Sequence, residues 1–501
     1  MPYYSEIEWE LLQEDQIFES PIWKFEFPFE VPPIKKLIIK RAENYKVQVK
    51  IIFDYDVDFS KEIHNLGIID SIKISSETFG EEYLLKNTVP LNIVAKNIIN
   101  SHGTICLYLS PRNIIFNRLF DGDTAWIKEW YLNGPKNESI FPRIIDYNKK
   151  KIYEKELKNC PSELELGKKF KIETNQEYTM GRYMFCKLDD KNDILINLVP
   201  NKMKPDWSNK VCISYASNDY IQNKKLRNEI EFVISFIFGR KLIKIGEAHY
   251  DSNGIKIKEN IKNPFLNDIF NIKTVCISNN NFPIPFKAFD SNNEQIISNI
   301  INSFISLRNS LDFSTMFINY WNSTFLLPES KIVLLAASLE SIKDTWFKSK
   351  NSKQKTKILD KNEYDDLIKD IKKEFYNLFR NHKELLYNFN QLNRRSINKS
   401  FELFFEEINM EISDIEKKAI SYRNKPVHGN DIYSEDYSEM IIYSEVYHVI
   451  VNRVILSLLG YDGPYYMNNI IQSKVQKGLF YSFEELKEDI FQIKSYENDE
   501  E

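Results

Sequence analysis

Hydrophobic and polar residues alternate along much of the first half of the chain. Trp23, Phe25, Phe27 and Phe29 are separated by single charged or proline residues, and this period of two is typical of a strand with one buried face. Pro28 has no backbone N–H to donate, so we expect this strand at a sheet edge. Further strands are predicted at residues 36–40, 47–57, 71–75, 104–109, 178–188 and 194–199.

A helical pattern first becomes clear between Asn223 and Phe238, where hydrophobic residues recur every three or four positions. Two strand-like segments follow, at 241–250 and 255–258, on either side of a Ser-Asn-Gly sequence that is typical of a hairpin turn. Residues 279–293 are rich in Asn, Pro and Ser, so we expect a domain boundary there.

From Glu294 onward the hydrophobic period changes to 3.6 residues, which predicts helices. Further helices are predicted at about 329–348, 363–389, 397–408 and 434–459, the last of them ending at Gly460. Another helix begins at Ser413, because Ser-Asp-Ile-Glu is a capping-box sequence. The first helix of this half is marked by Ile297, Ile300, Ile301, Phe304 and Leu311.

These patterns predict an α+β multidomain protein, in which a β-rich domain (residues 1–285) precedes an all-α helical bundle (residues 290–501). The 501 residues are enough for more than one core, and 43% hydrophobic with 28% charged residues is ordinary for a folded chain. The first domain has no nucleophile, metal or phosphate motif, so we expect it to be a sensor or regulatory domain.

The charge of the chain is uneven. Its net charge of −5 gives no overall nucleic-acid footprint. Between residues 343 and 361, however, seven lysines face only Asp344 and Asp360, so this stretch could follow an RNA backbone while Trp346 and Phe347 stack on bases. A solvated loop is the alternative. The candidate RNA-binding residues are Lys348, Lys350, Lys353, Lys355 and Lys357.

The cysteines do not suggest a metal site. There are five of them, at positions 106, 160, 186, 212 and 276, with no Cys-x-x-Cys pair and no adjacent histidine. We therefore expect reduced thiols, no metal and no cofactor. The first residues lack a basic region followed by an apolar run, and we find no apolar run long enough to cross a bilayer. A cytoplasmic protein without a membrane segment is predicted.

Residues 421–429, Ser-Tyr-Arg-Asn-Lys-Pro-Val-His-Gly, carry the strongest functional signal. They bring together Arg423, which is always charged, the amide of Asn424, and His428, which titrates near neutral pH. Cleaving RNA without a metal requires proton transfer from the 2′-OH and to the 5′-oxygen, together with stabilisation of negative charge on phosphorus. The alternative is structural, since Arg and His also cap helix C-termini.

Arg423, Asn424 and His428 match the signature of the HEPN ribonucleases, in which Arg and a polar residue precede His by a few positions. The order of a β-rich half and a helical half resembles the ApeA-type bacterial anti-phage defence proteins of this class. The resemblance implies a HEPN ribonuclease domain that cleaves host RNA such as tRNA by 2′-OH transesterification. It also implies antiviral defence by abortive infection, started by a phage-encoded trigger protein.

On this interpretation His428 is the general acid or base, Arg423 stabilises the transition state, and Asn424 orients either of them. One chain offers one such histidine, so a homodimer or larger homo-oligomer that joins two copies of the HEPN domain would supply both acid and base. If Glu340 is the sole carboxylate on an otherwise apolar helix face, it could orient His428 or Arg423. An outward-facing glutamate is the alternative. A non-catalytic helical binding or sensor module remains the alternative function.

Overall fold

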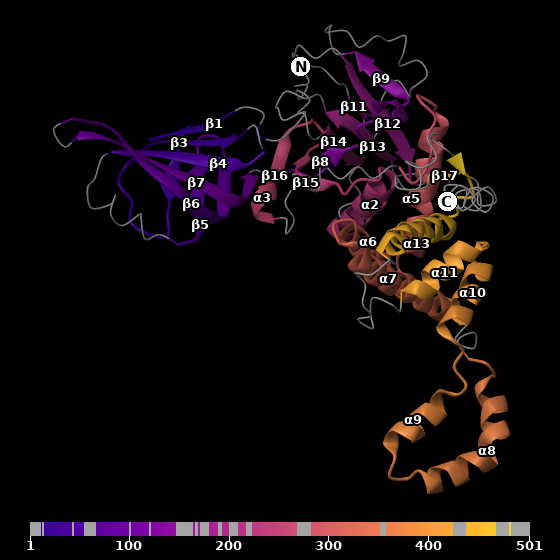
Figure 1. Cartoon of the computed structure of the whole chain (residues 1–501). Helices are drawn as coiled ribbons and strands as arrows, with labels where there is room; N and C mark the ends of the chain where they lie inside the picture. Colours follow the sequence, from indigo (N-terminus) through magenta and orange to yellow (C-terminus); the bar gives the residue numbers. More distant parts are fainter. Residues whose placement is uncertain are drawn as a thin grey trace. The chain divides into compact units, whose positions relative to one another are not determined.

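The computed structural model describes residues 12, 15–42, 45–54, 67–99, 102–119, 122–146, 164–165, 169–170, 180–188, 193–199, 209–216, 223–267, 282–350, 357–423, 437–466 and 480–481 (Figure 1). The chain divides into two compact units. The first comprises Met1–Asn279 and Phe286–Ser298, and the second comprises Asn280–Pro285 and Asn299–Glu501. Strands dominate the first and helices the second, so the fold is α+β.

A 14-stranded sheet, in which every neighbouring pair is antiparallel, forms the first unit. A separate pair joins β10 (Leu164–Glu165) to β11 (Lys169–Phe170). The strands of the sheet are β1 (Gln16–Glu19), β2 (Lys24–Glu26), β3 (Ile34–Arg41), β4 (Val47–Asp54), β5 (Ile69–Ser76), β6 (Glu81–Ile99), β7 (His102–Arg118), β8 (Trp126–Gly134), β9 (Arg143–Asp146), β12 (Met180–Lys187), β13 (Asp193–Val199), β14 (Asn209–Ala216), β15 (Ile243–Tyr250) and β16 (Lys256–Lys262).

Strand β7 joins the two parts of this sheet. Its first half pairs with β4 and its second half with β16, while β6 follows its other edge. The order runs β1-β3-β4-β7-β16-β15-β8-β14-β13-β12-β9, and β5 and β2 continue from β6. The register of β6 shifts between Pro90 and Asn92, where proline lacks the N–H that a regular ladder needs.

Every residue of strand β8 is buried, so both faces of the sheet are covered there. Helix α2 (Lys224–Ile237) packs against this region through its hydrophobic face and through Arg227. The side chain of Asn223 caps α2 by accepting the backbone N–H of Lys225 and of Leu226. The described residues of this unit also include the short helices η2 (Glu138–Ile140) and α3 (Pro264–Asn267).

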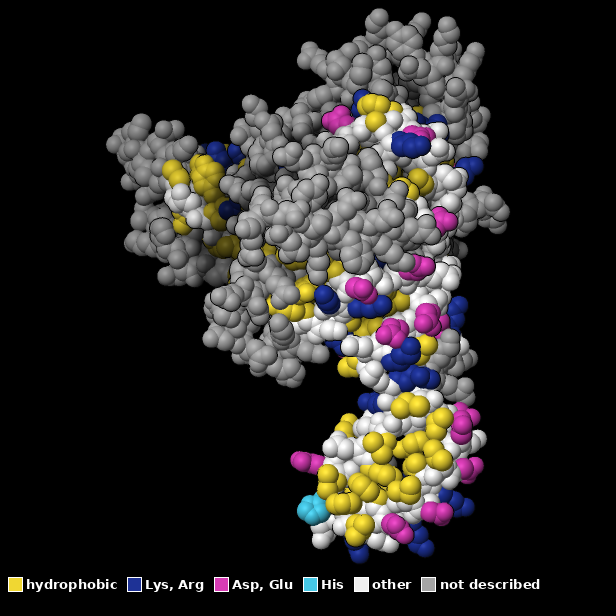
Figure 2. Space-filling view, turned by 45° about the vertical axis from the view of Figure 1, so that its right-hand side comes forward, with side chains coloured by type: hydrophobic (Ala, Val, Ile, Leu, Met, Phe, Trp, Pro, Cys, Tyr) yellow, Lys and Arg dark blue, Asp and Glu magenta, His cyan; other side chains and the backbone are white. Residues whose placement is uncertain are grey.

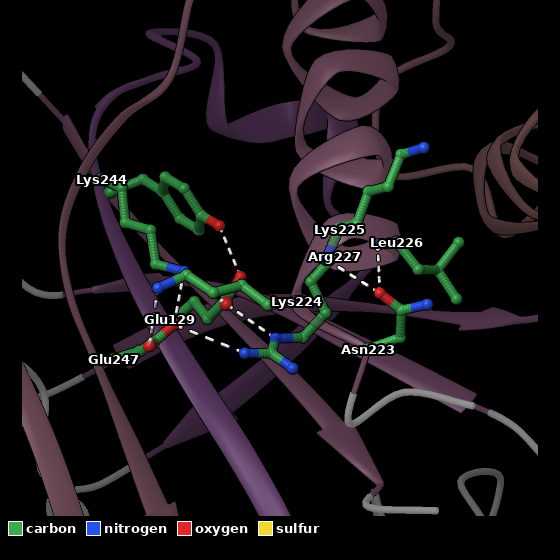
Figure 3. Close-up of polar contacts among 9 residues, drawn as sticks. Glu129, Asn223, Lys224, Lys225, Leu226, Arg227, Lys244 and Glu247 are labelled. Carbon is green, nitrogen blue, oxygen red and sulfur yellow. Dashed lines mark hydrogen bonds and ion pairs between the residues drawn. The ribbon is translucent and has the colours of Figure 1, made fainter. Parts of the chain in front are cut away.

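Four charged side chains form a buried network where α2 meets β8 and β15 (Figure 3). Glu129 accepts from Arg227 Nε at 2.8 Å and from Lys244 Nζ at 2.5 Å. Glu247 accepts from Lys244 at 2.7 Å, and Tyr131 donates its hydroxyl to Glu129 at 2.6 Å. Burial alone would raise the pKa of Glu129, but Lys244 and Arg227 hold it below its ordinary value. The network therefore remains charged and ties the helix to the sheet.

Helices make up almost all of the described part of the second unit, together with one strand pair, β17 (Tyr465–Tyr466) and β18 (Phe480–Tyr481). Helix α5 starts in the first unit. The helices are α5 (Asn292–Leu307), α6 (Phe313–Ser323), α7 (Pro328–Ser349), α8 (Lys361–Leu378), α9 (Lys383–Gln391), α10 (Ile397–Glu407), α11 (Asp414–Tyr422) and α13 (Tyr437–Leu458).

Helix α7 is at the centre of this bundle, where it packs against α6, α10 and α13. Leu335 and Leu339 of α7 and Ile450 and Val454 of α13 are fully buried. Helix α13 is long and apolar enough to cross a membrane by length and composition, but 78% of its apolar window is buried inside the protein. That burial is typical of the core helix of a soluble protein.

The structure confirms most of the predicted elements and corrects three of them. The strand expected over Trp23–Phe29 covers only Lys24–Glu26. The helix marked by Ile297 ends at Leu307, before Leu311, because Asp312 caps a new helix through the N–H of Thr315. The helix predicted at 363–389 is two helices, because the chain turns at 379–382. This turn lets the ring of Phe389 stack on that of Phe375, with the ring centroids 4.3 Å apart.

We predict that Glu129→Ala lowers the free energy of unfolding by about 3 to 5 kcal/mol, because it leaves Lys244 and Arg227 buried without their main partner. The exposed control Glu138→Ala, which loses a surface pair with Arg182, should change it by less than about 1 kcal/mol. Denaturant titration at neutral pH measures both values. Equal effects would show that the network does not stabilise the sheet.

The same titration should depend on pH in a defined direction. Since the folded pKa of Glu129 lies below its unfolded value, its contribution is present above the unfolded pKa of about 4.3 and is lost as the pH falls through the folded pKa. The free energy of unfolding of the wild type should therefore exceed that of Glu129→Ala at neutral pH, and this difference should shrink as the pH falls.

Candidate functional site

Arg423 is the C-terminal cap of helix α11. Its position depends on how the N-terminal end of that helix is held. Ser413 starts α11 with the capping box predicted from the sequence: Glu416 Oε2 accepts the backbone N–H of Ser413 at 2.9 Å and its hydroxyl at 2.8 Å. Glu416 Oε1 accepts from Arg453 of α13, and both side chains of this pair are 1% exposed. Arg453 also donates to the Glu411 carbonyl at 2.7 Å. Helix α11 is thereby fixed against α13.

The guanidinium of Arg423 lies where four helices meet. Its Nη1 donates to the Ile420 carbonyl at 3.1 Å, and its Nε lies 3.4 Å from Glu340 Oε1 of α7. The guanidinium also lies over the ring of Phe401 on α10, 5.2 Å from the centroid. Burial raises the pKa of Tyr447 on α13, and the neighbouring Arg423 opposes that rise. We call Arg423, Glu340, Phe401 and Tyr447 the Arg423 cluster.

The sequence suggested two partners for Glu340, His428 and Arg423, and the Arg423 cluster contains the second of them. Glu340 pairs with Arg423, as one alternative predicted, and its side chain is 40% exposed whereas Arg423 is 5% exposed. Asn424 and His428 lie outside the described residues, so whether they approach Arg423 stays a prediction. The sequence alone did not predict that Phe401 would stack on Arg423, because an aromatic residue 22 positions earlier carries no local signal.

Lys343, which is not among the lysines predicted for RNA contact, also lies over the ring of Phe401. Lys343 is 6% exposed, and its Nζ lies 4.8 Å from the centroid of Phe401. It is thus part of the packing of α7 against α10 and not of a solvated basic stretch. The basic stretch available to a ligand is shorter than the run of seven lysines suggested.

The structure describes part of the predicted RNA-binding residues. Lys348 and Lys350 are exposed at the end of α7, and Lys350 Nζ lies 4.9 Å from the centre of the Trp346 ring. Lys357 forms a β-bridge with Arg394, and Lys353 and Lys355 lie outside the described residues. Lys and Arg side chains gather where α8 and α9 join the bundle (Figure 2). Arg394 and Arg395 are further candidate RNA-binding cations that we did not predict, although the adjacent Arg-Arg pair in the sequence could have indicated them.

The prediction that both aromatic residues of this stretch stack on bases is wrong for Phe347, which is 1% exposed in the core. Trp346 is half-buried: its Nε1 donates to Glu407 at 2.7 Å and its ring contacts Phe404 edge-on. Both aromatic residues therefore hold α7 against α10.

A cavity of about 810 Å³ opens between α10 and α11, next to Phe401. Its lining includes Glu402, Glu406 and Glu411 but only one cation, Lys417. Three carboxylates repel phosphate, so an RNA backbone would not be favoured in this cavity.

One further buried histidine lies in the core of the helical unit. His448 of α13 is buried with Nε2 2.8 Å from the Tyr320 hydroxyl, and burial lowers its pKa well below the ordinary value. It therefore remains neutral and packs in the core of the bundle. In the part of the chain that the structure describes, no three His, Cys, Asp or Glu side chains are grouped so that they could hold a metal ion.

Comparison with known proteins adds no family to this description. The chain matches no protein-family model, and no curated protein or solved structure matches it at a significant level.

Proposed function

We propose that the protein is a metal-independent endoribonuclease of the HEPN type. The observation that carries the proposal is the fixed position of Arg423 at the end of α11, where it pairs with Glu340 directly before the Asn-Lys-Pro-Val-His segment. Arginine is suited to this role because its planar fork matches two phosphate oxygens. A phosphate that binds Arg423 would weaken the ion pair between Arg423 and Glu340, or would share the guanidinium with Glu340.

The proposed reaction is an in-line transesterification. A base removes the proton of the ribose 2′-OH, the 2′-oxygen forms a bond to phosphorus, and the P–O5′ bond breaks as an acid protonates the leaving 5′-oxygen. The products are a 2′,3′-cyclic phosphate and a 5′-OH end. His428 performs one of the two proton transfers, Arg423 stabilises the charge on phosphorus, and Asn424 orients the phosphate or one of these side chains.

The proposed biological role rests on the resemblance to the ApeA-type anti-phage defence proteins. The protein acts in the cytoplasm as an antiviral defence enzyme that cleaves host RNA such as tRNA in abortive infection. The β-rich unit regulates the nuclease in response to a phage-encoded trigger. The basic residues Lys348, Lys350 and Arg394 support RNA binding by the helical unit.

A second candidate function is a non-catalytic binding or sensor module. The burial of Arg423, which leaves only 5% of it exposed, favours this alternative. In that case Arg423 serves to join α7, α10 and α11, and the trio is structural.

Replacing the proposed catalytic residues separates the two functions. We expect His428→Ala to reduce cleavage of tRNA by about 10² to 10⁴, the usual contribution of general acid–base catalysis. Arg423→Ala should have a similar effect and Arg423→Lys should restore little, because an ammonium cannot make the forked contact. The assay uses purified full-length protein in EDTA.

Two variants serve as matched controls. His249→Gln replaces a histidine whose pKa is lowered to about 4 by burial and which is therefore neutral already. Arg118→Ala removes an arginine that pairs only loosely with Glu81. Both should cleave at the wild-type rate. Unchanged cleavage by His428→Ala, or unfolding of Arg423→Ala and Arg423→Lys alike, would favour the structural alternative.

The dimer expected from the single histidine leads to a further test. If two copies of the trio form one site, mixed dimers of wild-type and His428→Ala chains should be inactive. Activity should then fall roughly as the square of the wild-type fraction. A linear fall in a mixing series would mean that each chain works alone.

A further inference from the structure

The cavity between α10 and α11 has an apolar floor that the core of the bundle holds in place. Four of its lining side chains, Phe401, Phe405, Met410 and Ile420, are only 1% to 4% exposed. The rings of Phe401 and Phe405 stack one helical turn apart, with their centroids 5.8 Å from each other. Ligand pockets commonly enclose about 300 to 1,000 Å³ and combine an apolar lining with a few polar groups. The volume of about 810 Å³ lies within that range.

The rim of the cavity is acidic. Glu402 and Glu406 are exposed and four positions apart on α10, so they lie next to each other on one helix face. Glu411 follows in the loop before α11. Lys417 is the one cation among the lining residues, and its Nζ lies 3.6 Å from Asp414. The lining therefore has a net charge of −2, and it attracts cations over a surface of low polarity.

The carboxylates of the rim are available to a ligand. Glu406 forms no ion pair within the part of the chain that the structure describes. Glu402 pairs with Lys399 at 2.7 Å, but both side chains are about half exposed, and such surface pairs contribute little. No three carboxylates among the described residues are close enough together to hold a metal ion. The spread of the negative charge thus suits an extended cationic ligand and not a single ion.

Neutral polar groups complete the lining and favour a peptide. The amides of Asn398 and Asn409 and the hydroxyl of Ser421 can each donate and accept hydrogen bonds, as the backbone of an extended peptide requires. The lining residues of α10 run from Asn398 to Glu406, which is about 12 Å along the helix axis. Three or four extended residues cover that length.

We propose that the cavity between α10 and α11 is a docking site for a basic segment of a partner protein. Arg or Lys side chains of the segment pair with Glu402 and Glu406, and their aliphatic stems lie along the apolar floor. Nucleic acids and anionic membrane surfaces are disfavoured as occupants because the rim repels phosphate. A small organic cation would leave the neutral amides and much of the volume unused. The inference does not depend on the proposed ribonuclease activity.

The test is fluorescence anisotropy with the full-length protein and a short, fluorescein-labelled peptide in which Arg alternates with Leu, at about 0.15 M salt. Wild type should bind this peptide at micromolar concentration and should not bind the same peptide with Glu in place of Arg. Glu402→Gln/Glu406→Gln should raise the dissociation constant at least roughly 10-fold. The matched control Asp366→Asn/Asp370→Asn removes two exposed carboxylates at the same spacing on α8, so it should bind like wild type.

A substitution that fills the cavity without changing its charge separates docking from diffuse attraction. Asn398 is the second residue of α10 and is exposed, so Asn398→Trp should leave the circular dichroism unchanged but block the peptide. The control Asn362→Trp makes the same change at the exposed second residue of α8 and should bind like wild type. Binding that survives Asn398→Trp or Glu402→Gln/Glu406→Gln, or a wild type that does not bind the peptide, would overturn the proposal. Binding of spermine without binding of the peptide would also overturn it, since the cavity would then take a small cation.

Discussion

The position of Arg423 depends on one buried ion pair. Glu416 and Arg453 are both 1% exposed, and each would be costly to bury without the other. Glu416 also closes the capping box of α11, so the same carboxylate starts the helix and fixes it to α13. Arg423 follows two turns later at the other end of α11. Its location is therefore set by the core of the bundle.

This constraint gives the Arg423 cluster its chemical character. A guanidinium that is 5% exposed has lost most of its water, and Glu340 and the Ile420 carbonyl take the place of part of that water as its polar partners. Glu340 is the more exposed partner of the pair. Displacing this carboxylate with a phosphate would exchange one anion for another without leaving the cation unpaired. A preorganised cation of this kind is what the stabilisation of a phosphorane-like transition state requires.

Local signals predicted some of these features and could not predict others. The capping box at Ser413 and the cap at Asn223 are set by neighbouring residues, so the starts of α11 and α2 could be read from the sequence. Strand β8 was missed because all its residues are buried and its Lys128 and Glu129 interrupt any apolar run. The break before α9 depends on the contact of Phe375 with Phe389. For the site, Glu340 stood out as a carboxylate on an apolar face, whereas Phe401 and the burial of Lys343 depend on how α7 meets α10.

The central claim is that the 2′-hydroxyl is the nucleophile in RNA cleavage by this protein. The most direct measurement compares two synthetic RNAs that differ only in a 2′-deoxy substitution at the mapped cleavage position, with the wild-type protein in EDTA. The account predicts that the all-ribose RNA is cut to a 2′,3′-cyclic phosphate and a 5′-OH end, and that the substituted RNA is not cut at that position. Cleavage of the 2′-deoxy RNA at the same position, leaving a 5′-phosphate, would contradict it.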